Sequence, residues 1–145
     1  LTFINGEGKV GLASNGGAIE VSDNANLNVI CCTFKDNTGT IGGAVHISNK
    51  GTGSFVNSTF IRNTGKTAGG AIGSVGRIIT IDNCVFENNR AITRNTGNGG
   101  AIYLSSFSKA LISKISQEIM EVNLGLFIWV LHLEVIMQVL QTLIL

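Results

Sequence analysis

Acidic and basic side chains are the groups in this 145-residue chain that could cleave or transfer a bond, but their spacing does not bring them together. Cleavage of a polysaccharide needs acids, a base and often a metal gathered on one face of the fold. Asp23, Asp36 and Asp82 fall at unrelated positions of the repeat described below, so no carboxylate cluster accumulates. The arginines that do not complete such a cluster are Arg62, Arg77, Arg90 and Arg94. We expect no catalytic site in this chain.

The three cysteines, Cys31, Cys32 and Cys84, show neither CxxC nor Cys/His metal spacing, and three are too few for a disulfide scaffold. Cys32, Ser58 and Cys84 share one inward position of the repeat, so cysteine fills space there as a small apolar group. Cys32 and Cys84 lie two repeats apart, which is about 9 to 10 Å at the spacing of a parallel ladder and too far for a disulfide. We expect free thiols, no metal site and no cofactor.

His46 is the other candidate for chemistry. It follows Gly-Gly-Ala-Val, at the position held by Glu20, Gly73 and Tyr103 in the other repeats. Alternation along a strand turns this position outward. The sequence therefore predicts a solvent-exposed histidine without a site around it.

Composition sets broad bounds on the class of protein. The formal net charge is +1, which gives no electrostatic reason to expect nucleic acid or acidic lipid as partner. The chain has 19 glycines and no proline, which favours many tight turns made by Gly and Asn in left-handed conformations. Leu1 opens the sequence without a signal peptide, and we expect the chain to be a fragment of a longer protein.

An internal repeat organises residues 1–104. Each of four copies reads Phe, two residues, Asn, a polar stretch, then Gly-Gly-Ala-(Ile/Val), and the first copy departs by having Gly6 at the Asn position. The repeated residues are Phe3, Phe34, Phe60 and Phe86; Asn37, Asn63 and Asn89; and the pairs Gly16-Gly17, Gly42-Gly43, Gly69-Gly70 and Gly99-Gly100. From the second glycine to the next Phe takes 16 or 17 residues, whereas Phe to the glycine pair takes 8 to 13. One side of the repeat is therefore fixed in length, and the other accepts insertions.

A period near 26 residues, rich in Gly, Asn and β-branched residues, predicts one turn of a solenoid rather than a propeller blade or a pair of helices. Apolar residues alternate before each Phe, with a slip of one residue that marks a bend between two short strands. A third short strand begins after Gly-Gly-Ala. We therefore predict an all-β, right-handed parallel β-helix of about four coils with three strands each. Stacked coils place Phe on Phe, and the repeated Asn tolerates positive φ and bonds the next Asn in the stack.

This pattern resembles the repeats of the chlamydial polymorphic outer membrane proteins, in which FxxN and GGA(I/V/L) alternate. It is also similar to adhesin-like β-helix proteins of some archaeal and bacterial surfaces. The resemblance rests on Phe34, Asn37 and Gly42 to Val45 with their counterparts. It implies a cell-surface, outer-membrane or extracellular protein.

Two functions from different classes stay open on the sequence. The leading one is a non-catalytic, adhesin-like surface module, whose long loops at residues 6–15 and 90–98 contact a host or neighbouring-cell surface protein or glycan. Further β-helix coils of the parent chain would be its other partners. The alternative is a fragment of a polysaccharide lyase or hydrolase of the same fold, whose catalytic residues lie outside this chain.

Residues 105–145 abandon the repeat. Their apolar C-terminal stretch is long enough to cross a bilayer, but it contains His132, Glu134, Gln138 and Gln141, each costly in hydrocarbon. We hypothesise that this tail is translated out of frame, with any helix formed there reflecting local propensity alone. Read one base earlier, the codons of residues 116–119 can encode Phe-Thr-Arg-Asn and those of residues 125–128 Gly-Ala-Ile-Tyr. The nucleotide sequence decides this, because stop codons in that frame would favour a membrane or interfacial helix.

Overall fold

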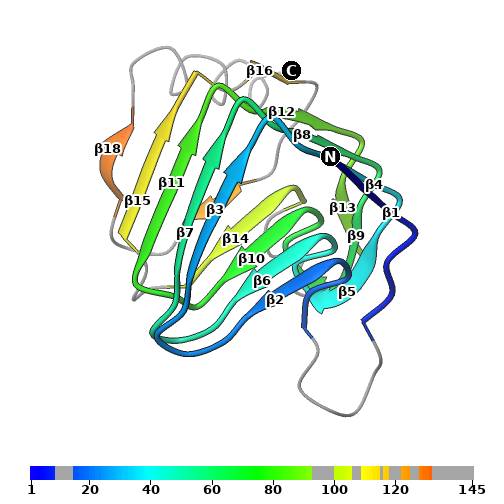
Figure 1. Ribbon diagram of the computed structural model, residues 1–145, viewed down its shortest axis with the longest axis horizontal. Helices are drawn as coiled ribbons and strands as arrows, with labels where there is room; N and C mark the ends of the chain where they lie inside the picture. Colours follow the sequence, from blue (N-terminus) through cyan, green and yellow to red (C-terminus); the bar gives the residue numbers. More distant parts are fainter. Residues whose placement is uncertain are drawn as a thin grey trace.

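The computed structural model describes residues 1–8, 15–92, 100–105, 109–114, 116–117, 122–124 and 128–131, and every helix or strand assigned within these ranges is a strand. All strand pairings among them are parallel. The strands form four sheets around one apolar interior, and the chain visits the sheets in turn as it winds (Figure 1). This is the parallel β-solenoid that the repeat predicts.

The four sheets are named here by what distinguishes them. The Phe sheet contains β1 (Thr2–Ile4), β4 (Thr33–Lys35), β8 (Thr59–Ile61), β12 (Val85–Glu87) and β16 (Ser116–Gln117). The Ile/Val sheet contains β2 (Ile19–Val21), β6 (Val45–Ile47), β10 (Ile72–Ser74), β14 (Ile102–Leu104) and β17 (Val122–Leu124). The long sheet contains β3 (Asn26–Ile30), β7 (Thr52–Val56), β11 (Ile78–Asp82), β15 (Lys109–Ser113) and β18 (Ile128–Leu131). The short sheet contains β5 (Thr38–Ile41), β9 (Thr64–Ala68) and β13 (Arg90–Ala91).

Each complete turn has four strands, one more than the sequence predicts. The second turn, for example, runs β6, β7, β8, β9, and three such turns are complete within the described residues, with partial turns at both ends. The strands of the short sheet were missed because their sequences, TGTI and TGKTA, lack the apolar alternation that marks a half-buried strand. Their pairing comes from stacking on the neighbouring turn, which a single turn's sequence does not reveal.

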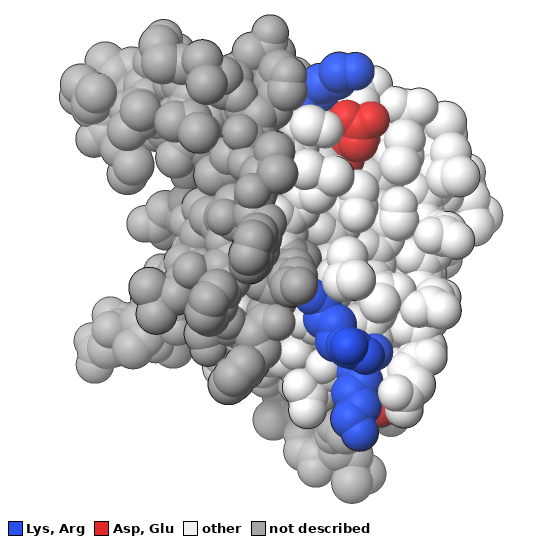
Figure 2. Space-filling view, turned by 90° about the vertical axis from the view of Figure 1, so that its left-hand side faces the viewer, with Lys and Arg blue, Asp and Glu red and all other residues white. Residues whose placement is uncertain are grey.

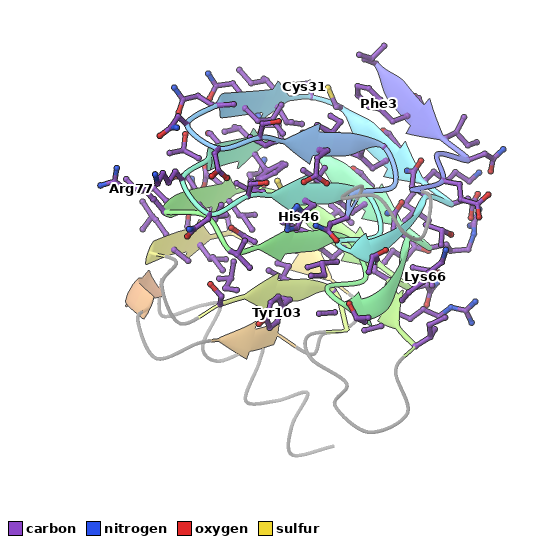
Figure 3. All side chains as sticks on the ribbon, turned by 90° about the horizontal axis from the view of Figure 1, so that it is seen from below. Phe3, Cys31, His46, Lys66, Arg77 and Tyr103 are labelled. Carbon is purple, nitrogen blue, oxygen red and sulfur yellow. The ribbon has the colours of Figure 1, made fainter. Side chains whose placement is uncertain are left out.

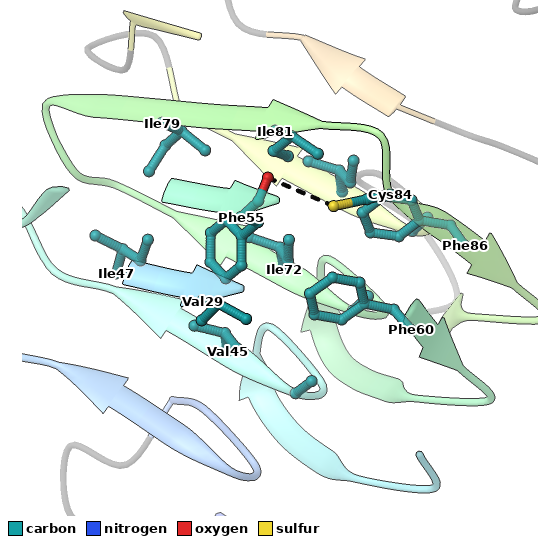
Figure 4. Packing of buried hydrophobic residues seen from close by; sticks show 14 of the residues in the cluster. Val29, Val45, Ile47, Phe55, Phe60, Ile72, Ile79, Ile81, Cys84 and Phe86 are labelled. Atoms are coloured by element: carbon teal, nitrogen blue, oxygen red, sulfur yellow. Dashed lines mark hydrogen bonds between the residues drawn. The ribbon is translucent and has the colours of Figure 1, made fainter. Parts of the chain in front are cut away.

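Register is kept from turn to turn, so equivalent residues of the repeat become neighbours. Phe34 pairs with Phe60 and Phe60 with Phe86, while Val29 pairs with Phe55 and Phe55 with Ile81. The inward residues of the Phe, Ile/Val and long sheets meet in one core, seen from close by in Figure 4. Of the apolar positions that the sequence assigns to the interior, Ile79, Ile81 and Cys84 are fully buried, whereas their counterparts in the first turn, Leu27 and Cys32, are partly buried.

Two bends in each turn use a non-glycine residue with positive φ. The bend between the long and Phe sheets places Cys31, Asn57 and Asn83 at φ of 53°, 50° and 51°. The bend after the Phe sheet places Asp36, Arg62 and Asn88 at 56°, 50° and 54°. These last residues come immediately before the repeated asparagines, so the prediction that Asn37, Asn63 and Asn89 themselves adopt positive φ is wrong. The left-handed residue bends the chain from the Phe sheet to the short sheet, and the Asn that follows it is buried in the central turns.

The glycine pairs occupy the corner between the short and Ile/Val sheets. Gly42 and Gly69 have positive φ, of 85° and 58°. At the second position of the pair the limit is space, because a Cβ on Gly43 would overlap the carbonyl oxygen of Gly70 in the next turn. The first glycine of the pair is therefore required for its backbone conformation, and the second for the close packing of consecutive turns.

The strands continue past residue 104. β15 pairs with β11 over its full length, and Ala110 and Ile112 are buried in the core. β16 places Gln117 opposite Phe86, and β17 places Val122–Leu124 opposite Ile102–Leu104. The described part of the tail is thus strand rather than helix. In the described ranges we find no helix with the length and apolar character of a membrane crossing.

The pairing of β16 and β17 also differs from the register that the out-of-frame reading assigns to residues 116 and 125–128. That hypothesis concerns the nucleotide sequence and stays a prediction. Most of the apolar stretch to which it applies, residues 132–145, lies outside the described residues.

Candidate functional site

The repeated phenylalanines form a continuous stack along the solenoid. Ring centroids are 4.8 Å apart for Phe3 and Phe34 and 4.9 Å for each of the next two pairs, with planes tilted by only 5° to 7°. Phe55 packs edge-on against Phe60, at 5.8 Å and 69°. The rings of Phe34, Phe60 and Phe86 are at most 1 % exposed, so this stack belongs to the core and does not form a binding surface.

The repeated asparagines form a second ladder beside the phenylalanines. The amide nitrogen Nδ2 of Asn63 donates to Oδ1 of Asn89 at 2.9 Å and to the carbonyl oxygen of Phe34 at 3.0 Å. Its Oδ1 accepts from the backbone N–H and from Nδ2 of Asn37, at 3.0 and 2.9 Å. Asn37 and Asn89 donate in the same way to the carbonyls of Phe3 and Phe60.

This ladder uses every hydrogen-bonding position of the central amide, since Asn63 donates both Nδ2 protons and accepts twice at Oδ1. Gly6, which takes the Asn position in the first copy, donates its backbone N–H to Asn37 Oδ1 at 2.8 Å. The ladder therefore fixes the bend and leaves Asn63 no capacity for a ligand. Of the glycines that the repeat singles out, Gly99 lies outside the described residues.

His46 is buried, and the prediction of a solvent-exposed histidine is wrong. Its side chain is 3 % exposed and its Nδ1 lies 2.6 Å from Oε1 of Glu20, which is 27 % exposed. The two residues are paired neighbours on β6 and β2, and Figure 3 shows His46 on the same sheet as Tyr103. Alternation did turn His46 away from the core, but its strand is not open to water there: the corner of the preceding turn lies so close that a Cβ on Gly16 would be 2.8 Å from the His46 backbone nitrogen.

Glu20 is the residue that sequence reasoning missed. Its Oε2 accepts the backbone N–H groups of Asn15 and Gly16 at 2.9 and 3.0 Å, and Ser48 Oγ donates to its Oε1 at 3.3 Å. The signal was available, because Glu20 and His46 lie 26 residues apart at the same position of consecutive repeats. An acid and an imidazole one period apart predict a contact in any solenoid with this register.

Asp36 and Arg62 form a second pair of unlike residues across one turn. Arg62 donates through Nε and Nη2 to the two carboxylate oxygens of Asp36, both at 2.8 Å. This hydrogen bonding holds the pKa of the Asp36 carboxyl below its usual range and raises the pKa of Arg62. The side chains are 33 % and 50 % exposed, so the pair is a surface contact rather than a reaction centre.

The cysteines occupy different environments. Cys31 is exposed, whereas Cys84 is fully buried and its thiol donates weakly to the carbonyl oxygens of Asp82 and Phe55 (Figure 4). Burial raises the pKa of the Cys84 thiol to about 11, so it is protonated at neutral pH. A protonated buried thiol is a poor nucleophile. That all three thiols are free in the purified protein stays a prediction.

Charge is sparse on one face of the molecule. Figure 2 shows the side that carries the long sheet, where the charged side chains of the described part lie in two separate groups with uncharged residues between them. Figure 3 shows Arg77 and Lys66 extending from opposite sides of the solenoid. Nowhere in the described ranges do three or more His, Cys, Asp or Glu side chains gather in a group that could hold a metal ion.

Comparison with known families bears on the repeat itself. Residues 83–105 match the Chlamydia polymorphic membrane protein repeat. The matched segment runs from the bend at Asn83 through Phe86, Asn89 and the glycine pair to the end of β14. No curated protein and no solved structure matches the chain. A repeat of this type on a parallel β-solenoid fits a surface-exposed repeat module of an outer membrane protein.

Proposed function

We propose that this chain is a non-catalytic, adhesin-like module of a cell-surface or secreted protein, which holds loops at fixed positions for binding. The observation that carries the proposal is the match of residues 83–105 to a surface-protein repeat. In the solenoid, the repeated side chains pack in the interior and are not available to a ligand. The most regular residues are Phe and Asn, and both face inward. Each Phe ring stacks on the next Phe, and each Asn side chain hydrogen-bonds to the next Asn. What varies between turns is the segment between Asn and the glycine pair.

The long segments at residues 6–15 and 90–98 are the proposed contact sites for a protein or glycan of a host or neighbouring cell. Their centres lie outside the described residues, but the ends of the first are anchored. Gly8 donates its N–H to the carbonyl oxygen of Thr38 at 2.8 Å, and Asn15 accepts from the N–H of Ile41 at 2.9 Å. A segment tied to the next turn at both ends is a suitable carrier for a recognition loop.

The test measures adhesion and turnover on the same protein. The full chain would be immobilised on beads and assayed for attachment to cells and to a glycan array, beside a variant in which residues 9–14 are replaced by Gly and Ser at equal length. A control variant carries Asn28→Ala and Ser54→Ala on the exposed side of the long sheet. We expect attachment by the parent and the control, and its loss in the loop variant.

Turnover of pectin-like or other acidic polysaccharides is assayed in parallel. We expect none above background. Turnover that is abolished by substitution of one acidic residue would overturn the proposal and favour the lyase or hydrolase alternative.

A further inference from the structure

We propose that Glu20 and His46 form a clasp that holds the corner at Asn15 and Gly16 against the second turn. One carboxylate makes all the contacts: Oε2 accepts the two corner N–H groups, and Oε1 meets His46 Nδ1 at 2.6 Å. The corner belongs to the first turn and His46 to the second. Glu20 therefore joins two turns at the end of the first long loop.

The first turn needs such a clasp because it lacks the backbone bond that the next turn makes at the same place. At the next glycine corner, Gly42 donates its N–H to the carbonyl oxygen of Ala68, one turn further along the solenoid, at 2.9 Å. In the first turn, the equivalent Gly16 donates instead to the side chain of Glu20. A charged acceptor replaces a ladder carbonyl, and hydrogen bonds to charged groups are stronger than neutral ones.

His46 is a positioning residue that acts through Glu20. Because a carboxylate is an acceptor, the Nδ1 of His46 carries the proton in their contact, whether the ring is neutral or charged. The other ring nitrogen, Nε2, is buried, and no described residue lies within hydrogen-bonding reach of it. An imidazole with one ring nitrogen unsatisfied is a poor way to stabilise a fold, since an apolar ring of similar size would avoid that cost. Its contribution is to hold the carboxylate in place.

The contrast with Asp36 and Arg62 supports this assignment. Both pairs span 26 residues and join consecutive turns. The Asp36–Arg62 pair is largely open to water, whereas His46 is 3 % exposed and Glu20 also holds two backbone N–H groups. Loss of the first pair should leave the backbone unchanged, and loss of the second should free a corner.

Amide hydrogen exchange, resolved by NMR on the full 145-residue chain, tests the clasp. Two variants are compared with the parent: Glu20→Gln, which keeps the shape but not the charge, and His46→Phe, which keeps a ring but removes Nδ1. We expect exchange at Asn15 and Gly16 to accelerate by about tenfold or more in both, in line with a lost charge-assisted hydrogen bond. Exchange at the core strands, such as Val29 and Ile81, should stay within about twofold.

The control is Asp36→Asn, which removes the exposed pair of the same spacing and should leave exchange at Asn15 and Gly16 unchanged. Nitrogen NMR of the imidazole gives a second readout, with the Nδ1-protonated form of His46 expected in the parent and its signature altered in Glu20→Gln. Unchanged corner exchange in His46→Phe would overturn the clasp, as would acceleration spread evenly over the whole first turn. Neither result depends on what the loop binds, so the proposed function would stand or fall separately.

Discussion

Two of the corners in each turn, one after Phe and one at the glycine pair, are built on opposite rules. At the Phe–Asn corner, like residues meet like: Phe34 stacks on Phe60, and Asn37 bonds Asn63. At the glycine corner, unlike residues meet, as Glu20 and His46 do, and the segment leading into the corner changes length. The first corner fixes the spacing of the solenoid, and the second is free to diversify.

The difference has a physical cause. Inside the stack, the Asn ladder is satisfied only if each turn keeps Asn, since the donor of one Asn needs the acceptor of the next. The glycine corner needs a left-handed backbone at Gly42 and Gly69 and no Cβ at Gly43 and Gly70, and it places no demand on the residues before the pair. Substitutions at the Phe–Asn corner should therefore lower stability strongly, and the effect of one should depend on the residues stacked above and below it. Substitutions in the segment before the glycine pair should act independently of one another.

Phe60→Ala should have the largest effect. It removes the central ring of the stack, which touches Phe34, Phe55 and Phe86, and leaves a cavity that the paired backbones cannot close. We expect a loss of about 3 to 5 kcal/mol in the free energy of unfolding, measured by urea denaturation. A loss smaller than that of Thr64→Ala, a change at a partly exposed neighbour of the ladder, would contradict the inward assignment of Phe.

Asn63→Ala should follow closely. Asn63 is fully buried, and its removal leaves the Phe34 carbonyl, the Nδ2 group of Asn37 and the Oδ1 of Asn89 each one partner short. We expect a loss of about 3 kcal/mol, since buried polar groups left unpaired carry their full desolvation penalty.

Thr64→Ala is the matched control for Asn63→Ala. Its Oγ1 accepts a single exposed hydrogen bond from Arg90. The loss in the free energy of unfolding should therefore be about 0.5 kcal/mol. Equal effects of the two changes would mean that the Asn ladder contributes little and that the two corners do not differ.

Sequence reasoning succeeded where the molecule repeats itself. The inward Phe, the bonding of one Asn to the next and the parallel stacking all follow from residues that recur at one period. The position of the left-handed residue did not follow, because Asp36, Arg62 and Asn88 share a conformation but no residue type. Pattern matching assigned it to the neighbouring Asn that does recur.

It failed where one turn covers another. Strand alternation assumes that the outward face meets water, but the corner at Gly16 lies against the backbone of His46, and the side chain of Ile41 lies against Gly73. In that second case a Cβ on Gly73 would come within 2.6 Å of Ile41 Cγ2. These contacts depend on how consecutive turns are offset, which the repeat alone does not specify.

The buried thiol of Cys84 sharpens the comparison through pH. The pKa of this thiol is raised by burial to about 11, above that of an unfolded cysteine near 9.0. Between these pH values the unfolded chain loses a proton that the folded chain keeps. The contribution of this thiol to the free energy of unfolding is therefore fully present below pH 9 and is lost as pH rises through 11. The loss should approach about 2 to 3 kcal/mol.

Urea denaturation between pH 8 and 11 under reducing conditions measures this loss. Cys84→Ala removes the titrating group, and its stability should vary less with pH over the same range. Parallel curves for the two proteins would show that the thiol at this position does not titrate against folding.

The exposed pair of Asp36 and Arg62 gives the smallest effect and the finest test of the contrast between corners. Here an unlike pair is placed at the Phe–Asn corner, on the outside, where the inward ladder needs no help. The pKa of Asp36 is lowered chiefly by its hydrogen bond to Arg62, so its contribution to stability is present above the pKa of an unfolded carboxyl. That contribution is lost as pH falls through the folded value.

Carboxyl NMR should find Asp36 titrating below the usual range in the parent, and closer to it in Arg62→Gln or in high salt, which screens exposed charges. The thermal midpoint should barely move, because surface pairs in water contribute little. A large drop in the midpoint of Arg62→Gln would show that this outer pair supports the corner as much as the ladder inside it, and the division between the two corners would no longer hold.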